Sequence, residues 1–287
     1  MEHVKIIECP RDAMQGIHDF IPTDLKIQYI QKLLAVGFDA IDFGSFVSSK
    51  AIPQMKDTRD VLEQLDISNT SSKLLAIIAN LRGAQEASAF KEIDYLGYPF
   101  SVSETFQIRN TNATIIESFV RVQEIQDLIL HQNKQLIIYI SMAFGNPYGD
   151  IWNADEVLKW IEELKKIGIK KIALSDTIGV ASPESIRYLF SNLIGKINDI
   201  EFSAHFHTLP HQWQEKIDAA FSSGCHRFDG AIKGYGGCPM AKDELTGNMA
   251  TENLITYFKN KNIPTSIQMN QFDDAMNFTA NIFNHYH

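Results

Sequence analysis

Cysteine is scarce in this sequence, and long apolar runs are missing. Its three cysteines, Cys9, Cys225 and Cys238, are too few and too scattered for a disulfide framework, which indicates a reducing compartment. No apolar run approaches the ~18 residues that a membrane-spanning helix needs. The strand-like run VKIIE follows the N-terminus without a targeting signal. We therefore expect a cytoplasmic protein that does not associate with a membrane.

Positive charge is also in short supply. Lysine and arginine total 26 against 35 aspartates and glutamates, which gives a formal net charge of -9. Because duplex binding needs a basic face that displaces counterions, this balance argues against a nucleic-acid binder. A local basic pocket for a phosphorylated cofactor is compatible with the composition. The 287 residues are enough to bury a sizeable core.

Short apolar, β-branched runs alternate with amphipathic segments of helical length along the whole chain. The predicted strands are residues 4–8, 40–44, 73–78, 93–98, 135–141, 171–176, 200–207 and 226–232. The predicted helices are residues 24–36, 54–65, 84–90, 112–131, 154–167, 183–196, 212–222, 251–261 and 270–283. Eight successive βα units match a (β/α)8 barrel, whereas a doubly wound open sheet rarely needs so many. Because no linker divides the chain, we expect one α/β TIM-barrel domain over residues 1–287, with extra C-terminal helices.

Polar side chains gather at the C-terminal ends of the predicted strands and in the loops that follow. They are Arg11, Asp12, Asp42, Ser45, Ser141, Asp176, Thr177, His205, His207 and, in the glycine-rich loop after the last strand, Cys238. In a (β/α)8 barrel these ends and loops carry the chemistry. The sequence therefore predicts an active site at this rim.

The pair His205 and His207 is the first candidate for metal binding. Residues two apart on a strand project to the same face, so both imidazoles point the same way. A lone histidine is most often structural, and the H-x-H spacing alone is a weak signal. With Asp12 at the same rim, two imidazoles and a carboxylate are a suitable set of ligands for a divalent metal.

Cys238 is the candidate reactive cysteine. Most free cysteines are small buried hydrophobes, and we interpret Cys9 and Cys225 in this way. Cys238 instead lies between Gly237 and Pro239 in a predicted rim loop. A nearby cation or metal would bring its pKa close to working pH.

Three further charged residues at the rim have two interpretations each. Arg11 is either a surface ion-pair partner or, beside Asp12, a group that stabilises an oxyanion or enolate. Asp42 and Asp176 either cap the next helix or face the pocket as proton acceptors.

Five motifs resemble those of the hydroxymethylglutaryl-CoA lyase family, in the same order and over nearly the whole chain. They are CPRDAMQG, SFVSSKAIPQM, SDTIGV, HFH and GGCPMAKDELTGNMATENL. The resemblance implies a barrel fold and metal-dependent cleavage of 3-hydroxy-3-methylglutaryl-CoA into acetoacetate and acetyl-CoA. It also implies an acyl-CoA partner, a homodimer, and Mg²⁺ or Mn²⁺ without any organic cofactor beyond the CoA moiety of the substrate.

The resemblance also implies roles for residues at matching positions. The implied metal ligands are Asp12, His205, His207 and Asn248. The implied catalytic residues are Cys238, Arg11, which stabilises the enolate, Asp176 of the DTIGV motif, and Asp42. The implied substrate contacts are Arg11, Ser45 and Thr177. Lys50 and Lys242, in rim loops, are candidates for contacts with the CoA phosphates.

This sequence departs from the family pattern in four places. Asp42 stands where the family has a glutamate, Thr208 where the histidine motif continues with aspartate, and Ala13 where the family has glycine. The loop between Cys238 and Asn248 is one residue longer.

Three alternatives to this lyase stay open at the sequence level. A sister lyase would act on a different branched 3-hydroxyacyl-CoA, with Phe43 and Met142 either near its acyl pocket or in the core. A condensing synthase of the isopropylmalate or citramalate type would carry an extra C-terminal region and lack the GGCP loop. A non-enzymatic barrel would bind CoA esters without turnover.

Overall fold

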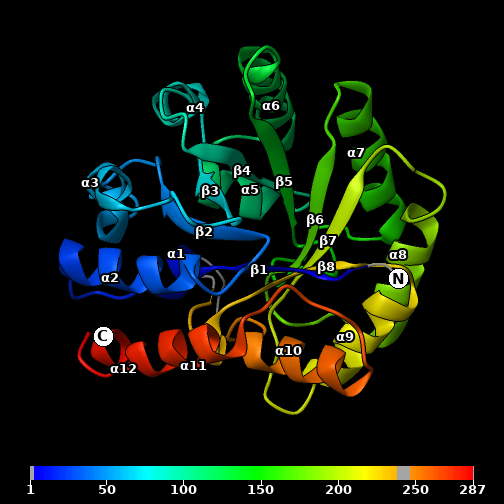
Figure 1. Ribbon diagram of the computed structural model, residues 1–287. Coiled ribbons are helices and arrows are strands. Elements are labelled where there is room, and N and C mark those ends of the chain that lie inside the picture. The colour runs from blue at the N-terminus through cyan, green and yellow to red at the C-terminus, as the bar shows by residue number, and fades with distance from the viewer. Residues whose placement is uncertain (1–2, 238–245, 287) are drawn as a thin grey trace.

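The structure of the protein, a computed structural model, describes residues 3–237 and 246–286. Its strands pair in parallel in chain order, and β1 pairs with both β2 and β8, which closes the barrel (Figure 1). They are β1 (Lys5–Glu8), β2 (Ala40–Ser45), β3 (Lys73–Ile77), β4 (Ile93–Ser101), β5 (Gln135–Ser141), β6 (Lys171–Asp176), β7 (Glu201–Phe206) and β8 (Arg227–Gly230). All eight predicted strands are present. The predicted (β/α)8 barrel is confirmed, and the open-sheet alternative is wrong.

Helices connect the strands and cover the outside of the barrel (Figure 1). They are α1 (Pro10–Gln15), α2 (Thr23–Leu34), α3 (Thr58–Gln64), α4 (Leu81–Ser88), α5 (Glu104–Thr111), α6 (Ile115–Ile129), α7 (Ala154–Lys166), α8 (Pro183–Leu193), α9 (Trp213–Ser222), α10 (Thr251–Asn260), α11 (Met269–Phe278) and α12 (Ala280–Phe283), with short 3-10 helices η1 (Pro53–Met55) and η2 (Ile232–Gly234). Their apolar faces pack on the outer side of the strands and form the main hydrophobic core.

Two helices, α1 and α5, have no predicted counterpart. No helix is predicted for the segment CPRDAMQ, but Pro10 in the first helical turn starts a six-residue helix there. In α5, the Ser103 side chain accepts a hydrogen bond from the backbone N–H of Phe106, and Asn112, with φ of 51°, ends the helix. The predicted helix 112–131 therefore begins only at Ile115.

Two other predicted helices are divided in the structure. The segment 54–65 splits into η1 and α3, and the segment 270–283 splits into α11 and α12. The last two helices lie beside α2 (Figure 1), where Phe272 packs edge-on against Phe38 and Phe278 stacks on Tyr29. The predicted extra C-terminal helices are thus confirmed. Among the described residues, no helix is long and apolar enough to cross a membrane.

Candidate active site

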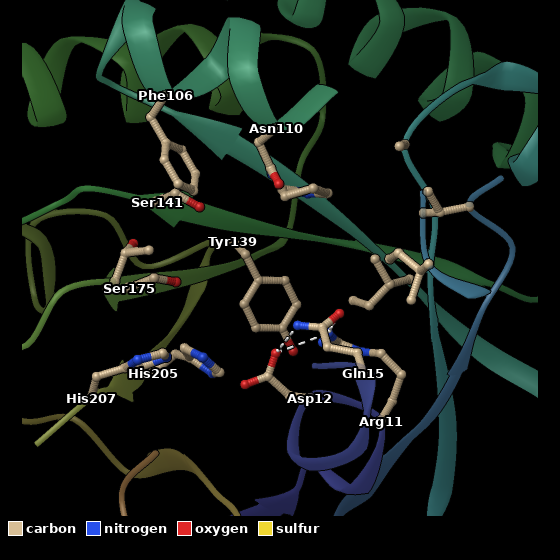
Figure 2. A pocket seen from close by; sticks show the side chains of 16 residues that line it. Arg11, Asp12, Gln15, Phe106, Asn110, Tyr139, Ser141, Ser175, His205 and His207 are labelled. Atoms are coloured by element: carbon tan, nitrogen blue, oxygen red, sulfur yellow. Dashed lines mark hydrogen bonds and ion pairs between the residues drawn. The ribbon is translucent and has the colours of Figure 1, made fainter. Parts of the chain in front are cut away.

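A cavity of about 140 Å³ lies at the C-terminal ends of the strands. Its polar wall comes from α1, α5, β5, β6 and β7 and from the residues that follow β6 and β7 (Figure 2): Arg11, Asp12, Gln15, Asn110, Tyr139, Ser141, Ser175, Thr177, His205 and His207. Its apolar wall includes Val47, Ile52, Ile77, Pro99 and Phe106. Polar groups and a possible metal site therefore meet an apolar surface at the rim where the sequence predicts the active site.

The four predicted metal ligands lie together at this rim. Asp12, His205 and His207 each offer a donor atom, and these atoms lie within 4.8 Å of one another. Asn248 forms a β-bridge with His207, and its Nδ2 donates hydrogen bonds to Asp12 Oδ2 at 2.7 Å and to the carbonyl oxygen of Tyr235 at 2.9 Å. Because its nitrogen makes both bonds, the Asn248 amide oxygen is the atom suited to a cation.

Both imidazoles are oriented by acceptors on their Nδ1 atoms. His205 Nδ1 lies 3.1 Å from Asp229 Oδ2, and His207 Nδ1 lies 3.1 Å from the carbonyl oxygen of Thr246. A neutral imidazole that donates from Nδ1 presents the lone pair of Nε2 to a metal. Thr208, where the family has aspartate, therefore does not leave His207 without an acceptor.

The local helix α1 arranges the charged residues of the first motif. Arg11 and Gln15 are four residues apart and Asp12 and Gln15 three apart, so the three side chains meet on one side of the helix. Arg11 Nη1 donates to Asp12 Oδ1 at 2.9 Å and to Gln15 Oε1 at 2.8 Å, while Gln15 Nε2 donates to Asp12 Oδ1 at 2.7 Å. These contacts fix the three side chains at the cavity (Figure 2).

Asp42 completes the fixation of Arg11. Arg11 Nε lies 3.0 Å from Asp42 Oδ2, and Nη2 also donates to that oxygen. The shorter side chain of aspartate thus still reaches Arg11 directly. Together the contacts to Asp42, Asp12 and Gln15 engage four of the five N–H donors of the guanidinium, which leaves one Nη2 hydrogen for a substrate.

Asp42 and Asp176 do not face the cavity, so the expectation that they do is wrong. Neither carboxylate belongs to the cavity wall. Ser175 and Thr177 project into the cavity, so Asp176 between them points to the opposite side of the strand. There Lys216 Nζ donates to Asp176 Oδ2 at 2.6 Å, and the backbone N–H of Ala181 donates to Oδ1 at 3.1 Å.

Some of the other predicted residues line the cavity and others do not. Thr177 lines it, and its Oγ1 accepts a hydrogen bond from the backbone N–H of Met142 at 2.9 Å. Ser45 does not line it but belongs to a neighbouring depression, which corrects its expected position as a contact in this cavity. Phe43 and Met142 are buried core residues outside the cavity wall.

Two predicted residues, Cys238 and Lys242, lie outside the described residues. Lys50 is exposed in the connection between β2 and α3. Cys9 and Cys225 are buried, as expected of structural cysteines.

The ionisable groups of the site have displaced pKa values. Burial opposes ionisation of Asp12, but Arg11 and the two imidazoles outweigh it and lower the pKa of Asp12 to about 2. Burial raises the pKa of Asp42 to about 6 despite its ion pair with Arg11. Burial and the neighbouring His205 lower the pKa of His207 to about 4. At neutral pH Asp12 is therefore an anion and His207 a neutral imidazole, the forms that bind metal.

The sequence analysis missed several residues of the site, among them Gln15, Tyr139 and Asp229. The Tyr139 ring lines the cavity and meets the His205 ring edge-on, with ring centroids 5.5 Å apart. Burial raises its pKa well above the ordinary value, so the phenol keeps its proton as a donor. Inward alternation on β5 and β8 could have identified Tyr139 and Asp229, and helical spacing from Arg11 could have identified Gln15.

Comparison with known proteins agrees with the geometry of the site. Residues 3–279 match the HMGL-like family model. A cytoplasmic 3-hydroxy-3-methylglutaryl-CoA lyase of Rattus norvegicus is 32% identical over 286 residues, which cover 99% of this chain and 82% of the relative. A mitochondrial hydroxymethylglutaryl-CoA lyase of Arabidopsis thaliana is 30% identical over 96% of this chain and 59% of its own length.

Solved structures show the same likeness. An HMG-CoA lyase from Acinetobacter baumannii, in complex with coenzyme A and 3-methylmalate, superposes with a TM-score of 0.92 at 31% identity, covering 99% of this chain and 92% of that one. The HMG-CoA lyase of Bacillus subtilis gives the same TM-score at 28% identity, covering 99% and 95%. On the family match over nearly all of its residues, together with these relatives, the chain belongs to the HMGL-like family.

Proposed function

We propose that the protein is a divalent-metal-dependent carbon-carbon lyase that cleaves 3-hydroxy-3-methylglutaryl-CoA into acetoacetate and acetyl-CoA. One observation carries the proposal. Asp12, His205, His207 and a guanidinium with one uncommitted N–H line a single cavity, and Asn248 is hydrogen-bonded to Asp12 beside it. Family membership and the relatives named for this reaction support it.

The residues of this group are suited to Mg²⁺ or Mn²⁺, which is our proposal for the cofactor. Asp12 is anionic, and Nε2 of both histidines and the Asn248 oxygen are the proposed donors, which gives a mixed nitrogen and oxygen set. When bound, such a cation supplies Lewis-acid chemistry that holds substrate oxygens and lowers the pKa of the C3 hydroxyl.

The chain's own residues support the bond cleavage. Loss of the hydroxyl proton drives cleavage of the C2–C3 bond, and its electrons arrive on the thioester as an enolate. With both imidazole lone pairs given to the cation, the Asp12 carboxylate, which lines the cavity, is the candidate acceptor for the proton. Arg11 directs its remaining N–H at the enolate charge, and Asp42 acts through Arg11 as a positioning residue.

Completion of acetyl-CoA requires a proton at C2 of the enolate. By the resemblance, we assign that proton to the Cys238 thiol. The apolar wall from Val47, Ile52, Ile77 and Phe106 limits access of water to the enolate before the proton arrives. Thr177 and Tyr139 are proposed to donate hydrogen bonds to substrate oxygens.

The CoA moiety is the proposed partner of the neighbouring depression. Ser45, Lys56 and Arg59 line it, and Val47 belongs to both its wall and that of the cavity. Three cations line the depression, Lys56, Arg59 and Arg82, and they support a contact with the CoA phosphates. The homodimer implied by the resemblance stays a prediction. A cytoplasmic location is supported by the rat relative, although the Arabidopsis one is named mitochondrial.

The test is product formation from 3-hydroxy-3-methylglutaryl-CoA by metal-stripped protein with EDTA, Mg²⁺ or Mn²⁺. We expect acetoacetate and acetyl-CoA in equal amounts, only with metal. Cys238→Ala should abolish turnover but keep Mn²⁺ bound, whereas His205→Ala should lose both. No products with Mn²⁺ demonstrably bound would reject this substrate and favour a sister lyase for another branched 3-hydroxyacyl-CoA.

A further inference from the structure

A second group of possible metal ligands lies beside the Asp12 group and shares His205 with it. Cys9 and Asp229, together with His205, offer donor atoms within 4.8 Å of one another. We propose that Cys9, His205 and Asp229 form an inhibitory site for a thiophilic divalent ion such as Zn²⁺, and that its occupation excludes the ion at the Asp12 group.

The three residues are brought together by neighbouring strands. Cys9 directly follows β1, which pairs with β8, and Asp229 on β8 is the register partner of His205 on β7. Asp229 Oδ2 and His205 Nδ1 lie 3.1 Å apart. Tetrahedral Zn²⁺ with bonds of about 2.0–2.1 Å to nitrogen and oxygen requires a separation of roughly 3.3 Å. The distance between Asp229 Oδ2 and His205 Nδ1 is therefore already close to the separation that Zn²⁺ requires.

The chemistry of the donors favours zinc over magnesium. A thiolate, an imidazole and a carboxylate are a soft and mixed set, which suits Zn²⁺, whereas Mg²⁺ prefers oxygen ligands. The Asp229 carboxylate lies within 4.8 Å of the Cys9 sulfur, so the group has a negative charge that attracts a divalent ion.

Sharing of His205 makes the two sites exclusive. A neutral imidazole has one N–H and one lone pair. When the ion is at the Asp12 group, His205 Nδ1–H donates a hydrogen bond to Asp229 and His205 Nε2 binds the ion. When the ion is at the Cys9 group, His205 Nδ1 binds the ion and His205 Nε2 carries the proton. Binding of Zn²⁺ therefore releases the Cys9 thiol proton to solvent and transfers the Nδ1 proton to Nε2. The imidazole then has no lone pair for the other ion.

The first test is Co²⁺ absorption in metal-stripped protein, which does not depend on the proposed lyase activity. We expect a near-ultraviolet thiolate-to-cobalt band in the wild type that disappears in Cys9→Ser and in Cys9→Ala. It should persist in Cys225→Ser, a matched control whose buried thiol bonds to the Arg227 carbonyl oxygen instead. It should also persist in Cys238→Ser. A missing wild-type band, or one lost only with Cys238, overturns the proposal.

The second test is Zn²⁺ inhibition of the Mn²⁺-loaded enzyme. Cys9→Ser removes one of the three proposed Zn²⁺ ligands. The Zn²⁺ concentration that inhibits this variant should therefore be higher than for the wild type by about tenfold or more. Mn²⁺ affinity in that variant should stay unchanged, since Cys9 is not a member of the Asp12 group. Equal inhibition of wild type and variant would mean that Zn²⁺ acts elsewhere and would contradict the proposal.

Discussion

His205 is the residue on which most of the site depends. It belongs to both groups of possible ligands, and its ring touches those of Tyr139 and His207. Its orientation is set by Asp229, a carboxylate with a relative exposure of only 3%. A metal-binding imidazole usually relies on such a partner to fix its tautomer.

We predict that Asp229→Ala lowers Mn²⁺ affinity by about 10- to 100-fold, because His205 loses the acceptor that fixes Nδ1–H. Free Mn²⁺ measured by electron paramagnetic resonance gives the affinity directly. Asp218→Ala is the control, since Asp218 pairs with Lys261 at the surface. Unchanged affinity in Asp229→Ala would show that His205 does not need this partner.

At the residue scale, local sequence patterns identified the candidate ligands but not the residues that orient them. The spacing of His205 and His207 places both on one face of β7, which depends only on strand geometry. Asp229 lies 24 residues from His205, and their contact depends on the pairing of β7 with β8. Local sequence patterns do not contain such a contact.

At the scale of elements, α9 is tied to the rim by Lys216. This buried lysine donates to Asp176 Oδ2 and, at 3.0 Å each, to the carbonyl oxygens of Gly179 and His207. The DTIGV motif is therefore held by a buried ion pair behind the cavity. We assign Asp176 a positioning role, which replaces its expected place as a proton acceptor in the cavity.

We predict that Lys216→Met destabilises the protein by about 3–5 kcal/mol, because it leaves the Asp176 carboxylate buried without its cation. Denaturant-induced unfolding measures the loss. The double variant Lys216→Met with Asp176→Asn should recover part of it, since the buried charge is then gone. If the double variant is as unstable as the single one, the unpaired charge is not the cause.

Glu8 connects three elements around the loop that carries Cys238. Its Oε1 accepts from the backbone N–H of Ile232 in η2 at 2.9 Å, and its Oε2 accepts from Thr251 Oγ1 at the start of α10 at 2.6 Å. Burial raises its pKa to about 8. Both flanks of the described chain around residues 238–245 are thus joined to β1.

The raised pKa makes stability depend on pH. Between the ordinary pKa of 4.5 and about 8, the folded state keeps a proton that the unfolded state has lost. The free energy of unfolding therefore falls as pH rises through this window. Glutamine is neutral at every pH, so Glu8→Gln should remove the pH dependence that Glu8 adds to the free energy of unfolding.

We accordingly predict that Glu8→Gln gains stability relative to the wild type from about pH 5 to about pH 8, by a few kcal/mol in total. Denaturant unfolding across this range is the measurement, and Glu163→Gln on the exposed side of α7 is the control. A constant difference between Glu8→Gln and wild type across the range would exclude a protonated Glu8 at neutral pH.

The strands were predictable because each is a short apolar run bounded by polar turns, as in KIALSD of β6. The helices α1 and α5 were not predicted. In α1 the buried residues include the charged Arg11 and Asp12, so this helix lacks an apolar face. In α5 only Phe106 and Gln107 are buried, so its sequence lacks the apolar periodicity of a helix against a core.

At the scale of the whole molecule, the two ends of the barrel differ in chemistry. At the N-terminal end, Glu201 pairs with Lys5 and Lys171, and Arg227 pairs with Asp39, so charges of both signs neutralise one another. At the C-terminal end the paired charges surround a cavity and leave donor atoms for a cation and a substrate. This division is typical of (β/α)8 barrels, whose stability and activity reside at opposite ends.

Counting βα units was sufficient to predict this architecture, because the number of units alone distinguishes a closed barrel from most open sheets. The apolar wall of the cavity could not be predicted in the same way. Val47, Ile77 and Phe106 come from three separate connections or strands, and only closure of the barrel makes them neighbours.

The most direct test of the account is a crystal structure with Mn²⁺, in which anomalous scattering locates the ion. We predict one peak bonded to Asp12, to Nε2 of His205 and His207, and to the amide oxygen of Asn248, with Asp229 still accepting from His205 Nδ1. A Mn²⁺ ion bound elsewhere, or through Nδ1 of His205, would contradict the assignment of this rim as the catalytic metal site.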